Sequence, residues 1–82
     1  MGTLHRFDGH RVFIWSNDHR PAHVEVVKAE KLAVFILNCP QGPVSLREKY
    51  GFTSAQIGKI ERELNPMVAD LCAEWEIVHG KH

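Results

Sequence analysis

The sequence predicts an α+β domain in which a four-stranded antiparallel meander precedes a short helix and a long C-terminal helix packed on the sheet. The first half of the chain contains β-prone segments separated by short turns. The second half contains two helix-capping patterns and an apolar stripe with helical spacing. With 82 residues, we expect one domain over 1–82, with the meander over 3–38 and the helical part over 45–79.

The first two predicted strands, 4–7 and 11–15, flank Asp8-Gly9. Asp-Gly between β-prone segments is a strong hairpin signal, because the turn requires positive φ at both central residues. This register places Arg6 opposite Arg11, an unfavourable pair of like charges unless an anion lies nearby. The alternative is that both arginines simply point into water.

The next two predicted strands cover 22–28 and 32–38. In the first, Val24 and Val26 point to one face, whereas His23, Glu25 and Val27 point to the other. The second is apolar on both faces, which is typical of a central strand that is covered on both sides. The segment 39–43 contains two prolines and a glycine and therefore ends the sheet.

Two capping boxes mark the predicted helices. Ser45 with Glu48 predicts a short helix that ends at Gly51, and Thr53 with Gln56 predicts the start of the long helix. Pro66 interrupts the apolar stripe without changing its phase, so we favour one kinked helix over about 54–79 rather than two helices. The stripe consists of Ile57, Ile60, Leu64, Met67, Leu71, Trp75 and Val78.

Composition narrows the class of protein. Ten basic and ten acidic residues cancel, which weakens the case for strong non-specific nucleic-acid binding but leaves room for a local basic patch. No apolar run reaches the length of a membrane span or a signal peptide, so we expect a cytoplasmic protein without a membrane partner. Cys39 and Cys72 are far apart in sequence, and in this compartment we expect both to be reduced thiols in the core.

Polar residues concentrate where a turn meets the third predicted strand. His23 and Glu25 share a strand face, about 6.5–7 Å apart, and the turn before them can fold back toward that face. Three readings remain open: an ordinary polar turn, an acid/base site and a metal site. The residues concerned are Asp18, His19, Arg20, His23 and Glu25.

The acid/base interpretation assigns proton transfer to His19, His23 and Glu25, and suits RNA cleavage through the 2′-hydroxyl. The metal interpretation is weaker, because Pro21 excludes a helical His-x₃-His pair and a fourth ligand would have to come from Asp18 or from a distant residue such as His10. Phe13 and Trp15 share a strand face with Arg11 and could stack bases, although this pattern more often reflects core packing with one charge at the edge. Substrate-binding candidates are Arg6, Arg11, Arg20 and Asp18.

Several segments together resemble one family, the small bacterial proteins of domain-of-unknown-function family 4160. Asp18, His19, Pro21 and His23 match its Asp-His-x-Pro-x-His-x-His signature, whereas Glu25 stands where the last histidine falls. The other segments are the early His-Arg-Phe-x-Gly, Leu37 to Pro40, Leu46 to Phe52, and Trp75 to Gly80. The resemblance implies a gene pair that looks like a toxin–antitoxin module, and Glu25 implies a weakened or silenced activity.

From residues and resemblance together, we expect this chain to be the toxin of such a module, acting by metal-independent RNA cleavage and without a cofactor. The first alternative is a non-catalytic antitoxin or adaptor that acts through protein–protein binding. The second is a metal-binding domain. The expected partners are the small cognate protein from the neighbouring gene, RNA as a candidate substrate, and a second copy of the chain in a homodimer.

Overall fold

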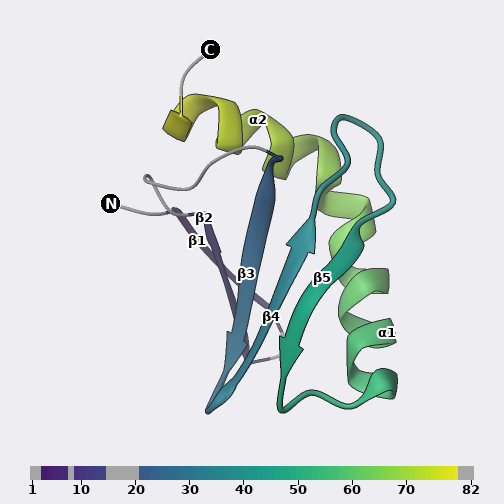
Figure 1. Cartoon of the computed structure of the whole chain (residues 1–82). Helices are drawn as coiled ribbons and strands as arrows, with labels where there is room; N and C mark the ends of the chain where they lie inside the picture. Colours follow the sequence, from purple (N-terminus) through teal and green to yellow (C-terminus); the bar gives the residue numbers. More distant parts are fainter. Residues whose placement is uncertain (1–2, 8, 15–20, 80–82) are drawn as a thin grey trace.

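The computed structural model describes residues 3–7, 9–14 and 21–79, which form a five-stranded antiparallel sheet and two C-terminal helices (Figure 1). The strands follow one another in the order β1-β2-β3-β4-β5. The sequence prediction of an antiparallel sheet followed by C-terminal helix is confirmed, but there are five strands rather than four. Their bounds are β1 Thr3–Phe7, β2 His10–Ile14, β3 His23–Lys28, β4 Lys31–Ile36 and β5 Ser45–Tyr50.

The short helix predicted from the first capping box is wrong, since Ser45–Tyr50 is the edge strand β5. Ser45 pairs with Ile36 and Tyr50 with Leu32, so hydrogen bonds to β4 replace the local cap. A bulge between the Val34 and Phe35 pairings leaves Arg47 without an opposite residue. Long-range pairing with an existing strand edge therefore outweighs a four-residue helix signal.

Both predicted tight hairpins are present. Arg6 lies directly opposite Arg11 in the β1–β2 ladder, as the Asp-Gly turn predicts, and Gly9 has a φ of 75°. Lys28 pairs with Lys31 at the β3–β4 turn, where Ala29 has a φ of 53°. These pairings fix which side chains share a face of the sheet.

The hydrophobic core contains one face of the sheet, here called the inner face, together with residues of both helices. The alternation predicted for β3 is confirmed, because Val24 and Val26 are fully buried while their neighbours are half-buried. The same cluster includes Leu64 and Leu71 from the helical stripe. Its other sheet members are Val12, Ile14, Ala33 and Phe35.

The C-terminal part stays helical from Ser54 to His79, but it is divided into α1 (Ser54–Leu64), a 3₁₀ turn η1 (Asn65–Met67) and α2 (Val68–His79). Figure 1 shows α1 and α2 running in clearly different directions on either side of η1. The predicted kink therefore lies at Pro66, inside the 3₁₀ turn. Thr53 and Gln56 form the predicted capping box. None of the helices described has the length and apolar character needed to cross a bilayer.

The expectation of two reduced thiols is wrong, because Cys39 and Cys72 form a disulfide in the structure. The loop between β4 and β5 carries Cys39 back over α2, so residues 33 positions apart have their Cα atoms 5.8 Å from one another. This separation lies in the range that a disulfide spans. The separation of 33 residues along the chain gave no indication that the two cysteines are in contact. The peptide bonds before Pro40 and Pro43 in this loop are cis.

Candidate functional site

The sheet face opposite the core, here called the outer face, carries most of the described candidate residues. The β2–β3 ladder places Arg11 opposite Val27 and Phe13 opposite Glu25. Because side chains alternate along a strand, Arg11, Phe13, Glu25 and His23 then share this face. Arg6, directly opposite Arg11, belongs to it as well. The register therefore places four predicted site residues on one face, Arg6, Arg11, His23 and Glu25, with the arginines level with Val27 and His23 four residues, about 13 Å, further along β3.

The two arginines form a local concentration of positive charge in a chain whose formal net charge is zero. Both are exposed, and they lie side by side in adjacent strands. The Arg11 guanidinium carbon lies 5.9 Å from the centre of the Phe13 ring, a cation–π arrangement. Arg6 and Arg11 thus present two cations and one aromatic ring to any anionic group that approaches the outer face.

His23 is held in a defined orientation at the start of β3. Its Nδ1 lies 2.8 Å from the carbonyl oxygen of Pro21. In the tautomer that makes this a hydrogen bond, Nδ1 donates and Nε2 keeps the lone pair that accepts a proton. The hydrogen bond therefore fixes the orientation of the imidazole ring at the start of β3.

Glu25 lies between two apolar neighbours, Phe13 on β2 and Val34 on β4. It is half-buried, and so is His23 two residues earlier on the same strand. Glu25 and His23 therefore lie on the same face of β3, as predicted. Asp18, His19 and Arg20, the remaining members of the predicted cluster, lie outside the described residues, as does Trp15.

An apolar strip occupies the centre of the outer face, which the sequence reading did not recognise as part of the site. Leu32, Val34 and Ile36 of β4 point away from the inner-face residues Ala33 and Phe35. Val34 is 8% exposed, and Leu32 and Ile36 are half-buried. The sequence signal that could have indicated this strip is the apolar pattern on both faces of residues 32–38. Tyr50, opposite Leu32 and 58% exposed, was missed because β5 was predicted as a helix.

The distant metal ligand proposed for this cluster does not reach it. His10 is 6% exposed and lies on the inner face with Val12, with its ring centre 5.9 Å from that of Phe52. A sheet separates it from His23 and Glu25. Within 3–7, 9–14 and 21–79, no group of three histidine, cysteine or carboxylate side chains is arranged to hold a metal ion.

The comparisons with known proteins identify a family but no activity. A family model described as "Domain of unknown function (DUF4160)" matches residues 9–76, which includes β2, β3, β4, β5 and α1 and most of α2. No curated protein and no solved structure matches the chain. The match covers far more than half of the 82 residues, so this chain belongs to the DUF4160 family.

Proposed function

We propose that this protein is one component of a two-protein bacterial module of toxin–antitoxin type and that it binds its cognate protein through the outer face of the sheet. The observation that carries the proposal is the apolar strip Leu32, Val34 and Ile36. An antiparallel sheet with one face on its core normally presents polar residues on the other. Contiguous aliphatic residues there favour a surface that a partner covers.

The surroundings of the strip specify the chemistry of that partner. Val27 and Phe13 extend the apolar surface toward β2, and Tyr50 extends it toward the β5 edge. Arg6 and Arg11 lie beyond it on one side only. A complementary partner therefore has an apolar centre and carboxylates that face the two arginines, since opposite charges at an interface rim set orientation and association rate. In this arrangement α1 and α2 cover the inner face and leave the outer face to the partner.

Co-expression with the protein encoded next to it, followed by size-exclusion chromatography and titration calorimetry, tests the proposal. Leu32→Asp places a charge in the apolar strip and should weaken the complex by at least about thirtyfold, the size of an interface hot spot. The matched control is Ile77→Asp on α2, because Ile77 is apolar and 81% exposed but lies outside this face. Equal loss in both variants, or no complex at all, would contradict the proposal. A dimer of the chain alone that Leu32→Asp dissociates would instead assign a second copy to this face.

RNA cleavage is the second candidate function, and the hydrogen bond that orients His23 favours it. In this mechanism His23 Nε2 removes the proton of a ribose 2′-hydroxyl, and the 2′-oxygen attacks the adjacent phosphorus. The 5′-oxygen leaves with a proton, and a cyclic phosphate remains. Arg6 and Arg11, four residues along the sheet from His23, contact neighbouring phosphates of the bound RNA, and Glu25 is the carboxylate on the same strand face. Asp18, His19 and Arg20 remain candidates of this proposal for the second acid and for further phosphate contacts.

Incubation of the purified chain with total RNA, with and without a chelator, tests this activity. Cleavage should persist in the chelator and fall by at least about a hundredfold in His23→Ala, the usual range for a lost general base. His79→Ala is the control, since His79 Nδ1 bonds the carbonyl oxygen of Trp75 at the end of α2. Cleavage that His23→Ala retains, or that both variants lose with the fold intact, would reject the catalytic assignment.

A further inference from the structure

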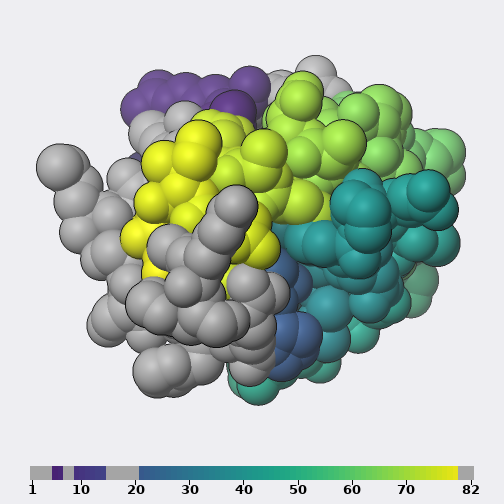
Figure 2. Space-filling view, turned by 90° about the horizontal axis from the view of Figure 1, so that it is seen from above, coloured from purple at the N-terminus to yellow at the C-terminus, as the bar shows by residue number. Residues whose placement is uncertain are grey.

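The two cysteines of the disulfide differ in their exposure to solvent. Cys39 lies in the β4–β5 loop and is exposed, whereas Cys72 is 7% exposed on the inward side of α2. Figure 2 shows the loop, in teal, lying directly against α2, in green and yellow. A molecule in solution therefore meets Cys39 as the more exposed partner of the bond.

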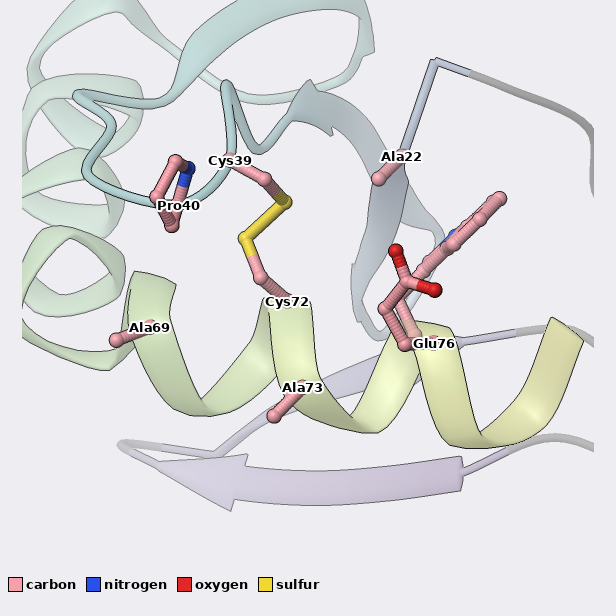
Figure 3. Close-up of a pocket in the computed structure, with 8 residues that line it drawn as sticks. Ala22, Cys39, Pro40, Ala69, Cys72, Ala73 and Glu76 are labelled. Carbon is pink, nitrogen blue, oxygen red and sulfur yellow. A yellow bond between two sulfur atoms is a disulfide. The ribbon is translucent and has the colours of Figure 1, made fainter. Parts of the chain in front are cut away.

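A pocket of about 420 Å³ opens beside this disulfide (Figure 3). Its walls are short or flat: Ala22, Pro40, Ala69, Ala73 and the indole of Trp75, with both cysteines among the lining residues. The volume suits a small molecule, and the small side chains leave room for one next to the sulfur atoms. Glu76 contributes a carboxylate to the lining.

The loop has anchors that do not depend on the disulfide. Leu37 is fully buried, and its N–H donates to the carbonyl oxygen of Ala22 at 2.9 Å. At the other end Val44 is 6% exposed, and its N–H donates to Oδ1 of Asn65 at 2.9 Å. Opening the disulfide therefore releases the loop tip around Cys39 while both ends of the loop stay attached to the domain.

We propose that the Cys39–Cys72 disulfide is a thiol–disulfide exchange site for a low-molecular-weight aminothiol that binds in the adjacent pocket. A thiolate attacks the Cys39 sulfur, the bond between the two cysteines breaks, and Cys72 leaves as a thiolate that takes up a proton. The product is a mixed disulfide on Cys39. The reverse attack by Cys72 expels the small thiol and restores the original bond. This site is separate from the outer face and from the function proposed for it.

Mass spectrometry of the non-reduced chain after exposure to cystamine and cysteamine tests the site. Cleavage at Lys31 and Arg47 isolates Cys39, and cleavage at Arg62 and Lys81 isolates Cys72, so the two cysteines fall on different tryptic peptides. We expect one cysteamine adduct on the Cys39 peptide and a free thiol on the Cys72 peptide. An adduct mainly on Cys72, or two free thiols that cystamine does not oxidise, would overturn the proposal.

Two comparisons separate recognition in the pocket from simple exposure. Ala73→Trp fills the pocket and should slow exchange at least about tenfold, whereas Ala55→Trp, at an exposed alanine of α1, should not. Cysteamine should react several-fold faster than the anionic 3-mercaptopropionate. For this comparison, the rate of each thiol is divided by its rate with a peptide disulfide. Glu76→Gln should remove the preference for cysteamine. Circular dichroism verifies each fold, and Ala69→Trp serves if Ala73→Trp is unfolded. Equal rates in the two tryptophan variants, or a preference for cysteamine that persists in Glu76→Gln, would mean that the disulfide reacts because it is exposed and not because the thiol binds in the pocket.

Discussion

At the residue scale, the pairing of Arg6 with Arg11 places two positive charges directly opposite one another. Two like charges directly opposite one another on adjacent strands lower the stability of a sheet. The pair persists beside Phe13 and next to the apolar strip, where an anionic group of a partner or substrate would compensate it. Under the proposed function, binding of an anionic partner would therefore relieve a repulsion that the free chain retains.

Arg6→Glu should convert this repulsion into an attraction with Arg11. We expect the free energy of unfolding to rise by about 0.2–1 kcal/mol, the usual range for a cross-strand pair. Binding through the outer face should weaken in the same variant. Urea unfolding and titration with the cognate protein measure the two effects. Arg62→Glu on α1 is the control, and a loss of stability in Arg6→Glu would mean that the arginines do not repel each other.

Glu25 is the residue at which the chain departs from the signature it resembles. Glu25→His should restore or increase toxicity in expressing bacteria, because the variant has two imidazoles on one strand face, at positions 23 and 25. Growth curves after induction measure the effect. Glu30→His, at an exposed position in the β3–β4 turn, is the control. Unchanged growth with soluble, folded Glu25→His would remove position 25 from any toxic activity.

At the scale of elements, β5 shows where sequence reasoning succeeds and where it fails. The tight hairpins could be predicted, because Asp8-Gly9 and the valines of β3 encode turn and register within a few neighbouring residues. β5 could not be predicted, because all six of its residues are exposed and it is a strand only through its pairing with the edge of β4. For the same reason the sequence indicated the arginines and His23 but not Tyr50. The disulfide also depends on a contact between distant segments.

The helical stripe offers a direct test of how the helices contribute to the core. Leu71 of α2 is fully buried in the same cluster as the inner-face strands. Leu71→Ala should lower the free energy of unfolding by about 2–5 kcal/mol, through lost burial and the cavity it leaves. Thermal unfolding measures this, with Ala73→Gly as a control for helix propensity, which costs only about 1 kcal/mol. An unchanged melting temperature in Leu71→Ala would mean that α2 is not docked on the core.

At the scale of the whole molecule, the disulfide joins the last part of the sheet to the last helix. It links positions 33 residues apart in a chain of 82 residues, so it restricts a large part of the unfolded state. The hydrogen bond between His5 Nε2 of β1 and Glu74 Oε2 brings the first strand to the same helix. α2 thus contacts both the first strand and the β4–β5 loop in the middle of the chain.

Reduction of the disulfide should lower the free energy of unfolding by about 3–4 kcal/mol in the chain-entropy description of a loop this long. In a domain of this size the melting temperature should fall by more than about 10 °C. Differential scanning calorimetry with and without a reductant measures the change. The double variant Cys39→Ser, Cys72→Ser should not respond to the reductant. A melting temperature that reductant leaves unchanged in the unmodified chain would mean that the bond contributes nothing to stability.

The order of the strands has a kinetic consequence. Every ladder joins strands that are consecutive in the chain, from β1–β2 through β4–β5. Loops between consecutive strands close at a smaller entropic cost than loops between distant ones, so domains of this kind fold in about milliseconds. Each hairpin can form as soon as its second strand leaves the ribosome. The helices are synthesised last, so the buried cluster is completed only when α1 and α2 have left the ribosome, and until then its strand residues are exposed to aggregation.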